Sequence, residues 1–513
     1  MVGKRTVLLF SAILFLTLLP GIHHGLWRPD EPQVAGICAG MAYEKDFVVP
    51  RLNGRPFLEK PPLYYALGAL SGMIFGEDND IGYRLVSAFF ASLTLLVTFL
   101  VASVRGGKMN GLLASGILAS SWGFFHLARW IEVDMSLVFS VTLAMFAYTK
   151  LSGKSVQGYS MLMGLAIGLS FMAKGFVGPT IIAASVVTDI VMQRSLSILK
   201  RIKPFWIMTI ALITILPWIF ALYGRGGFPF LREVIVVNNI MRFTGAPEGA
   251  ALGHMHGPFY YLIVFPQNFL PWTFAFVPAL ISSLRRLKED PYLPWFIGPF
   301  VLLSIASAKR GLYLIPLYPA CACMTALWLS RAAKARWEEL VVKGTWGIAV
   351  LAAFLPFVGL FFGKALLGIL SGCFSLASLY VVSRWRARDA LGLVLVICLS
   401  VSSAAAVWYS VMKEKRDYLG FTKEALSMAM GSEIIVLAPD EIFEGTLPMV
   451  TGRTYKVMAR PADVRREGLY VWADKDDIII REVQRIAKVE VILDKKFGNR
   501  PVRLALIKPN PLR

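Results

Sequence analysis

The sequence predicts a polytopic α-helical membrane protein that ends in a small soluble α/β domain. Of its 513 residues, 56% are apolar and 17% are charged, and the mean hydropathy is +0.60, which is too apolar for a soluble protein of this length. Long apolar runs recur as far as residue 410, whereas residues 411–513 hold 19 Lys/Arg and 15 Asp/Glu. We therefore expect a membrane domain over residues 1–410 and a soluble domain over residues 411–513.

Apolar runs near the length of about 20 residues that a helix needs to cross the hydrocarbon layer predict about thirteen transmembrane helices. In chain order they lie at residues 6–26, 81–104, 110–128, 132–151, 156–173, 175–193, 203–223, 260–284, 292–308, 311–331, 345–363, 366–383 and 389–410.

The basic residues predict the orientation of these helices. With the N-terminus in the cytoplasm, the inside segments collect 20 of the 34 Lys/Arg residues of the membrane domain and about 6 of its 18 acids, in agreement with the positive-inside rule. Thirteen spans then place the soluble domain on the periplasmic side, together with two long loops at residues 27–80 and 224–259. Because topology accounts for most of the net charge of +20, nucleic-acid binding is not expected.

The soluble domain alternates short β-rich runs with a helical pattern. The expected strands lie at residues 433–438, 469–472, 489–493 and 503–507, and the expected helix lies at residues 476–487. This pattern predicts an α/β fold. The five cysteines fall mostly in apolar runs, so neither a disulfide framework nor a zinc finger is expected.

Two pairs of carboxylates lie at the predicted outer surface. Asp30 and Glu31 follow the first predicted helix, and Glu132 and Asp134 open the fourth. Acids at such positions suit the first turn of a helix, so capping is one interpretation. The other interpretation is chemistry on an acceptor molecule, which a carboxylate can bind or deprotonate. Acidic side chains within a bilayer are energetically costly, so those that occur there usually have a function.

Basic residues gather at the same predicted outer surface. Lys60 lies near Arg55 and Glu59, and the two prolines after it hold the backbone extended. This lysine is either an anchor at the membrane surface or a ligand for a phosphate. Further cations predicted on this side are Lys174, Arg242, Lys309 and Arg310. Cations confined to one leaflet favour a site for an anionic head group.

The pair His254 and His256, in a chain with five histidines, is a weak signal for a metal. If a divalent metal binds, Glu59 would complete a site of nitrogen and oxygen ligands. No nucleotide cofactor is expected, because nucleotide sugars and ATP are not available outside a bacterial inner membrane. Group transfer there needs a donor that is already activated and delivered in the bilayer, and a sugar on a polyprenyl phosphate meets both conditions.

Six segments, taken in order, resemble the GT-C superfamily of polyprenyl-phosphate-sugar-dependent glycosyltransferases, especially its bacterial aminoarabinose transferase (ArnT) and protein mannosyltransferase-like branch. They are residues 30–31, 49–54 with 58–63, 132–135, 171–175, 230–243 and 309–319. Typical relatives read Asp-Glu-x-Arg-Tyr-Ala where this chain has Gln33 and Val34 after its Asp-Glu pair. We therefore expect different contacts to the acceptor, and the resemblance alone does not imply that the acceptor is lipid A or the sugar aminoarabinose.

The resemblance implies roles for individual residues, in a membrane domain with a cavity that faces the periplasm and interfacial helices in its first outside loop. Asp30 matches the carboxylate that contacts or activates the acceptor, and Lys60 matches the lysine that binds the lipid phosphate. The other catalytic candidates are Glu31 and Asp134. The other candidates for the donor phosphate are Arg55, Lys174, Tyr313 and Arg310. Glu59 and His256 match positions that resemble a divalent-metal site.

We therefore expect a monomeric, multi-pass inner-membrane glycosyltransferase that moves a sugar from undecaprenyl phosphate to an acceptor at the periplasmic face. The acceptor would be a lipid A-like glycolipid, another envelope glycan or a protein. The alternative is a flippase for the same lipid-linked sugars. A flippase predicts functional charges in both leaflets or at the midplane, whereas the charges here group on one face, which favours the enzyme.

Overall fold

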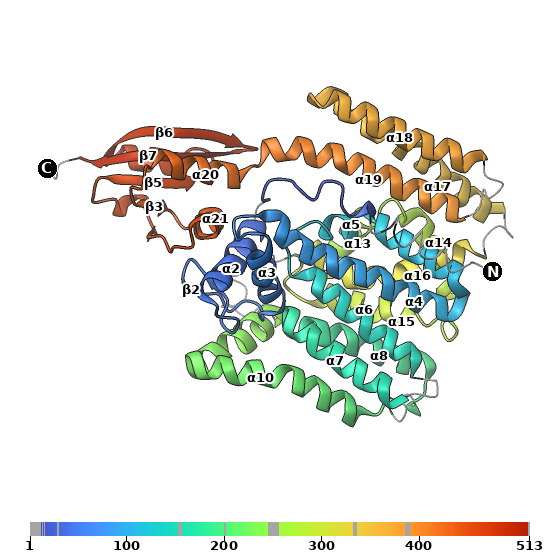
Figure 1. Ribbon diagram of the computed structural model, residues 1–513. Coiled ribbons are helices and arrows are strands. Elements are labelled where there is room, and N and C mark those ends of the chain that lie inside the picture. The colour runs from blue at the N-terminus through green and yellow to red at the C-terminus, as the bar shows by residue number, and fades with distance from the viewer. Residues whose placement is uncertain are drawn as a thin grey trace. The chain divides into compact units, whose positions relative to one another are not determined.

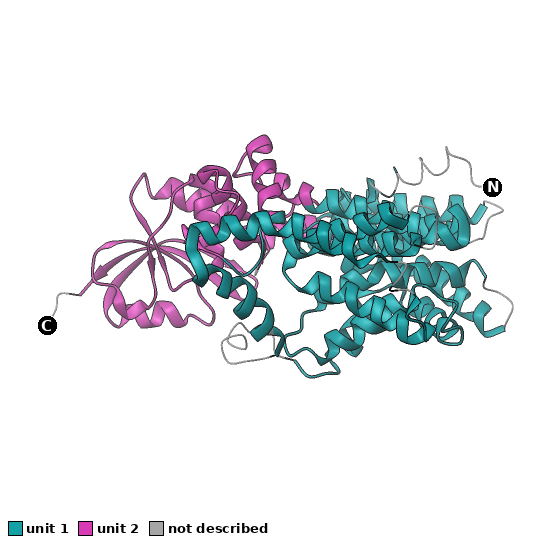
Figure 2. Cartoon of the chain, turned by 90° about the horizontal axis from the view of Figure 1, so that it is seen from below, with its two compact units in different colours: residues 1–20, 58–63, 87–407 teal, residues 21–57, 64–86, 408–513 magenta. Residues whose placement is uncertain are grey.

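The computed structural model describes residues 12, 14, 16–27, 30–151, 156–197, 199, 202–244, 256–331, 336–384 and 390–510 (Figure 1). The chain forms two compact units, which Figure 2 colours separately. Unit 1 comprises residues 1–20, 58–63 and 87–407, and unit 2 comprises residues 21–57, 64–86 and 408–513. The segment expected to be a soluble domain therefore shares a compact unit with most of the first long loop.

Unit 1 is built from helices. They are α5 (Trp122–Leu127), α6 (Asp134–Lys150), α7 (Val156–Lys174), α8 (Val177–Gln193), α10 (Pro204–Leu231), the π-helix η1 (Arg232–Met241), α11 (Arg242–Thr244), α13 (Tyr260–Asn268), α14 (Thr273–Leu284), α15 (Leu293–Ile305), η2 (Gly311–Leu317), α16 (Tyr318–Leu329), α17 (Arg336–Phe354), η3 (Leu355–Phe362) and α18 (Ala365–Arg384). Two long helices, α4 (Asp80–Ser120) and α19 (Ala390–Lys415), contribute residues to both units.

Most of the predicted spans reappear as helices whose ends differ by a few residues. Gly107, with a φ of 72°, divides α4 and separates the spans predicted at 81–104 and 110–128. In the part of the chain that the structure describes, seven helices are long and apolar enough to cross a membrane, or eight if the bent pair α13 and α14 forms one span. The helical membrane fold is confirmed, while the count of thirteen stays a prediction. The beginning of the span expected at 6–26 lies outside the described residues.

The span predicted at residues 260–284 is broken. Helices α13 and α14 meet at an angle of 118°, and the break contains Pro271, which has no backbone N–H to donate. The Leu270 carbonyl accepts a hydrogen bond from the Trp122 N–H at 2.8 Å, and the Trp272 indole donates to Ser120 Oγ at 2.9 Å. Polar groups that would otherwise be unsatisfied in an apolar bundle are thus bonded to neighbouring helices.

Unit 2 contains a five-stranded mixed sheet in the order β4-β3-β5-β7-β6. Its strands are β3 (Ile434–Leu437), β4 (Val457–Met458), β5 (Gly468–Ala473), β6 (Ala487–Phe497) and β7 (Arg500–Pro509). Strand β3 runs parallel to β4 and β5, whereas β7 is antiparallel to β5 and β6, with Tyr470 opposite Ala505. All four predicted strands are confirmed, and the predicted helix appears as α22 (Ile478–Gln484).

Both faces of this sheet are covered. Side chains alternate between faces along each strand, so Val436 and Val471 pack in one apolar cluster with residues of α20 (Tyr418–Met428) and α21 (Glu441–Thr451). Leu437 and Trp472 lie in a second cluster with Val483 of α22. The short turn η4 (Pro461–Asp463) completes this α/β arrangement.

Most of the rest of unit 2 comes from the first long loop. It forms α2 (Asp30–Glu44), a small hairpin of β1 (Arg51–Leu52) and β2 (Arg55–Pro56), and α3 (Leu63–Phe75). Helix α2 packs closely on α21 because glycines meet at the contact. A Cβ added to Gly36 would lie 2.5 Å from the Gly445 Cα, closer than real Cβ contacts allow.

We expect Gly36→Ala to destabilise unit 2 by about 1–3 kcal/mol, since the backbones of α2 and α21 would have to separate. Thermal unfolding of the purified protein in detergent measures this effect. Gly347→Ala in α17 is the matched control, because its added Cβ would meet no atom within 4 Å. Equal midpoints for the two variants would contradict the close approach of α2 and α21.

Candidate active site

A lysine and an aspartate form a buried ion pair in unit 1. Asp134 is the first residue of α6, and Lys174 is the last residue of α7. The Lys174 ammonium donates hydrogen bonds to both carboxylate oxygens of Asp134 at 2.6 Å. An acid at a helix N-terminus and a cation at a helix C-terminus are each favoured by the helix dipole. Two of the predicted site residues are thus joined directly.

Lys60 lies beside a second buried carboxylate. Its Nζ is 3.6 Å from Glu132 Oε1, and the Glu132 side chain is fully buried. At this separation the contact is an ion pair rather than a hydrogen bond. The buried Glu132 carboxylate thus places a negative charge beside the Lys60 ammonium.

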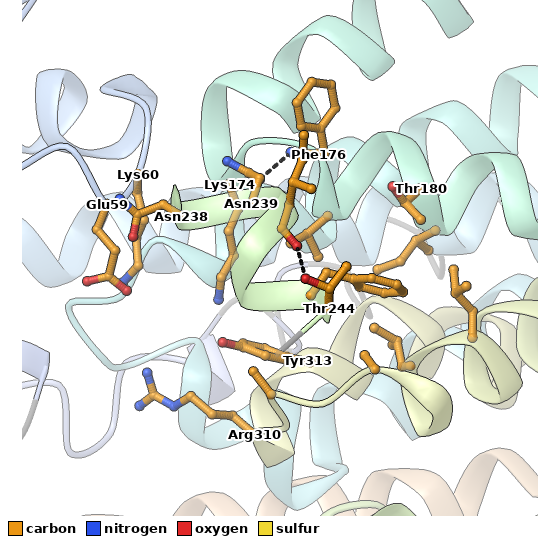
Figure 3. A pocket seen from close by; sticks show the side chains of 18 residues that line it. Glu59, Lys60, Lys174, Phe176, Thr180, Asn238, Asn239, Thr244, Arg310 and Tyr313 are labelled. Carbon is orange, nitrogen blue, oxygen red and sulfur yellow. Dashed lines mark hydrogen bonds between the residues drawn. The ribbon is translucent and has the colours of Figure 1, made fainter. Parts of the chain in front are cut away.

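Lys60 and Lys174 line one cavity of about 300 Å³ together with Arg310 and Tyr313. Figure 3 shows Lys60, Lys174 and Arg310 on one side of this cavity and Thr180 on the other. The Lys174 Nζ lies 4.5 Å from the centroid of the Tyr313 ring, which is a cation–π contact. Among the described lining residues, Glu59 is the one acid.

Most of the remaining wall is apolar. Its apolar members are Phe176, Val177, Ile181, Ile240, Phe243, Leu302, Leu303, Ala306 and Ala308. A cavity of this size falls at the lower end of the range of about 300–1,000 Å³ for small-ligand pockets. Cations beside a hydrocarbon wall suit an amphiphile with an anionic head, such as a lipid phosphate.

The lining also contains an asparagine that the sequence analysis missed. Asn239 Oδ1 accepts a hydrogen bond from the Phe176 N–H at 2.9 Å, and Asn239 Nδ2 donates to the Val234 carbonyl at 2.6 Å. Its neighbour Asn238 donates to the Leu58 carbonyl at 3.3 Å. These bonds tie η1 to the start of α8 and to the segment before Lys60. In the sequence, Asn238 and Asn239 could have been recognised as a pair of adjacent amides inside an otherwise apolar run.

The first predicted pair of carboxylates belongs to unit 2. Asp30 begins α2 and is 8% exposed. Glu31 is fully buried, and its carboxylate accepts hydrogen bonds from the Trp27 N–H at 2.6 Å and from the Arg84 Nε at 3.1 Å. Arg84 also pairs with Asp80. These contacts give Glu31 a structural role at the start of α2, and its catalytic assignment stays a prediction.

Arg55 also lies in unit 2, where it pairs with Glu444 of α21. The side chain of Arg55 is 62% exposed and that of Glu444 is 6% exposed. This carboxylate competes with any phosphate for the guanidinium. The predicted role of Arg55 in donor binding therefore stays untested, while its contact with α21 is a feature that the sequence pattern did not indicate.

The predicted metal ligands do not form a metal site in the described part of the chain, where no group of three or more His, Cys, Asp or Glu side chains could hold an ion. His254 lies outside the described residues. The His256 ring stacks on Tyr260 at 4.2 Å, and the Lys309 ammonium donates to the His256 carbonyl at 2.9 Å. The Lys309 bond is to the backbone carbonyl and not to the ring of His256, so a divalent metal at Glu59 and His256 stays a prediction.

Cysteine chemistry is also disfavoured in unit 2. Cys38 in α2 is buried, and burial raises the pKa of its thiol. A protonated thiol is a poor nucleophile.

The structure groups the predicted residues into two sets. Lys60, Lys174, Arg310, Tyr313 and Glu59 share the cavity of unit 1, with Asp134 bonded to Lys174. The residues of unit 2 are Asp30, Glu31 and Arg55. The set in unit 1 contains most of the side chains predicted to bind the donor phosphate, and the set in unit 2 contains two of the three predicted catalytic carboxylates.

Comparisons with known proteins identify a family and several relatives. The sequence model of the dolichyl-phosphate-mannose-protein mannosyltransferase family matches residues 34–225. An undecaprenyl phosphate-α-4-amino-4-deoxy-L-arabinose arabinosyl transferase of Pectobacterium carotovorum is 29% identical over a segment that covers 67% of this chain and 62% of that protein. The enzyme with the same name from Pseudomonas savastanoi is 30% identical and covers 69% of this chain and 66% of that protein. The matched segment thus spans about two thirds or less of these two relatives.

The fold matches a solved structure over nearly its whole length. The crystal structure of ArnT from Cupriavidus metallidurans bound to undecaprenyl phosphate has a TM-score of 0.80 against this chain, with 18% identity and 98% of each chain covered. These findings confirm the predicted family and a multi-pass protein of the inner membrane. The chain belongs to the GT-C superfamily of polyprenyl-phosphate-sugar-dependent glycosyltransferases, within its ArnT-like group.

Proposed function

We propose that this protein transfers a sugar from an undecaprenyl-phosphate carrier to an acceptor at the periplasmic face of the inner membrane. The observation that carries the proposal is the cavity of unit 1, where Lys60, Lys174 and Arg310 lie beside an apolar wall. The relatives named arabinosyl transferases support the same class of donor. The N-terminus would lie in the cytoplasm, residues 411–513 in the periplasm, and the enzyme would act as a monomer on a glycolipid, another envelope glycan or a protein.

The reaction follows from the charges in the cavity. An oxygen of the acceptor attacks the anomeric carbon, the bond from that carbon to the phosphate oxygen breaks, and the electron pair of this bond remains on the phosphate. Negative charge grows on the departing phosphate, so cations placed there stabilise the transition state more than the ground state. Lys60, Lys174 and Arg310 would supply this positive charge.

The role of Asp30 depends on the acceptor. A hydroxyl acceptor must lose a proton, which the Asp30 carboxylate would take as a general base. An acceptor phosphate is already ionised, and Asp30 would then only orient it. Asp30→Asn therefore distinguishes these two kinds of acceptor. It should lower kcat if the acceptor is a hydroxyl, and it should mainly raise the KM for the acceptor if the acceptor is a phosphate.

The test is release of free undecaprenyl phosphate by the purified full-length protein. It is incubated with a panel of radiolabelled undecaprenyl-phosphate sugars and an acceptor pool extracted from membranes. We expect release with one donor, and only when acceptor is present. No release with any donor, together with movement of labelled lipid across liposome leaflets, would favour the flippase instead.

A further inference from the structure

A second, larger cavity lies within unit 2. It is open to the surface and has a volume of about 1,180 Å³, more than the upper end of the range typical of small-ligand pockets. The hairpin of β1 and β2, the turn that follows α20 and the segment between α21 and β4 form its walls. Its lining residues are Asn53, Gly54, Arg55, Leu426, Ala429, Gly431, Ser432, Glu433, Ile434, Thr451, Arg453, Thr454, Tyr455, Lys456 and Val457.

The walls of this cavity are held together by specific bonds. Asn53 Nδ2 donates to the Tyr455 carbonyl at 2.8 Å, and Asn53 Oδ1 accepts from the Tyr455 N–H at 2.7 Å. Gly54 follows with a φ of 77°, and a Cβ there would lie 2.8 Å from the Thr454 methyl carbon. The tip of the hairpin is thus fixed against the segment before β4, which preorganises the cavity for binding.

The cavity carries an excess of positive charge. Its charged lining residues are Arg55, Arg453, Lys456 and Glu433. Lys456 bonds to Glu433 at 2.9 Å, and this ammonium lowers the pKa of the Glu433 carboxyl. No hydrogen bond or ion pair joins the exposed Arg453 guanidinium to the part of the chain that the structure describes. Arg453 is therefore available to a ligand, with Ser432, Thr451 and Thr454 as hydroxyl partners.

This chemistry differs from that of the cavity in unit 1. There, cations adjoin a wall of large apolar side chains, whereas here most lining residues are polar. Hydroxyls, amides and guanidinium groups are suited to the oxygen atoms of sugars and to phosphate or carboxylate groups. Unit 2 also contains Asp30, the carboxylate proposed to handle the acceptor.

We propose that this cavity of unit 2 binds the anionic carbohydrate part of the acceptor, with Arg453 as the principal contact to its charged group. The inference rests on the proposed function, because it assigns the acceptor to unit 2 and the lipid-linked donor to unit 1. It concerns recognition and adds no chemical step.

Binding of glucose 1-phosphate to the full-length protein in detergent tests this inference, with isothermal titration calorimetry as the readout and no donor present. Wild type should bind glucose 1-phosphate more tightly than either glucose or inorganic phosphate. Arg453→Ala should weaken binding about tenfold, the size expected for one charged hydrogen bond at a partly exposed site. Arg481→Ala in α22, which does not line the cavity, is the matched control and should bind as wild type does.

A second variant moves the affinity in the opposite direction. Glu433→Gln removes the one acid among the described lining residues, so it should tighten binding about two- to threefold if the ligand is an anion. Unchanged binding in both Arg453→Ala and Glu433→Gln would overturn the inference. Equal affinity for inorganic phosphate and glucose 1-phosphate would overturn the assignment to a carbohydrate.

The binding experiment can fail or succeed independently of the test of the proposed function. Binding is measured without donor or turnover, whereas release of undecaprenyl phosphate needs both. If the lipid phosphate is released but glucose 1-phosphate does not bind at this cavity, transfer stands and the acceptor site lies elsewhere. If glucose 1-phosphate binds with the expected pattern but no donor is turned over, the cavity is a carbohydrate site and the proposed transfer is wrong.

Discussion

Lys60→Ala is expected to lower kcat/KM for the lipid-linked donor by about 10²–10³-fold, the loss typical when one preorganised donor to a developing negative charge is removed. Lys60 lines the cavity of unit 1 and lies 3.6 Å from Glu132. Lys174, in the same cavity, bonds to both oxygens of Asp134. Initial rates of undecaprenyl phosphate release, measured over a range of donor concentrations, give kcat and KM separately.

The separation of the two constants carries the mechanistic information. A fall in kcat indicates that Lys60 stabilises the departing phosphate in the transition state, whereas a rise in KM alone indicates ground-state binding. Lys343→Ala is the control, because Lys343 is 71% exposed and pairs with Glu339 elsewhere in unit 1. Since the loss of Lys60 also leaves the buried Glu132 without this cation, the elution profile and unfolding midpoint must match wild type. A folded Lys60→Ala protein with wild-type kcat/KM would show that this cavity does not hold the donor phosphate.

The sequence predicted most of the fold because the relevant signals are local. Apolar runs about 20 residues long mark helices in a membrane, and Gly107 falls where two predicted spans separate. The strands of unit 2 alternate between two apolar clusters, and that alternation is readable from the order of residues. The grouping of Lys60 with Lys174 was likewise predictable, since the positive-inside rule placed both cations at one membrane surface.

The sequence could not show pairings between distant residues. Asn53 bonds to Tyr455 across 402 positions, and Gly36 meets Gly445. Neither contact leaves a periodic pattern in the chain. Charge density divided the sequence at residue 410, yet these contacts place most of the first long loop in the same unit as the C-terminal sheet. Composition shows which segments of the chain prefer water or lipid. The compact units depend instead on which surfaces of those segments pack together.

Glu31 illustrates the same limit at a single residue. Adjacent acids at a membrane surface suggested chemistry for both, but only the structure reveals Arg84, 53 positions away, bonded to the Glu31 carboxylate. A carboxylate that is fully buried and bonded to a guanidinium and a backbone N–H stabilises the fold around its neighbour. Asp30 is therefore the stronger candidate of the two for contact with an acceptor.

Arg84→Met is expected to destabilise unit 2 by about 3–5 kcal/mol, the cost typical of breaking a buried ion pair from one side. Arg84 is fully buried between Glu31 and Asp80, and its Nη2 also donates to the Gly25 carbonyl at 3.4 Å. The substitution leaves two buried carboxylates without their shared cation. Thermal unfolding in detergent should show a lower midpoint. Arg460→Ala is the control, because its exposed pair with Asp463 is worth at most about 1 kcal/mol.

A double-mutant cycle separates this ion network from simple loss of packing. If Arg84 acts by neutralising Glu31, then Glu31→Gln removes part of the buried charge, and the double variant Arg84→Met/Glu31→Gln should be less destabilised than the sum of the single variants. Additive losses would contradict coupling between the two side chains. Because Glu31 also accepts the Trp27 N–H at 2.6 Å, a loosened network should displace the first turn of α2 and with it Asp30. A loss of transfer by Arg84→Met at temperatures where the protein remains folded would therefore connect the buried ion network of unit 2 to the acceptor-side carboxylate.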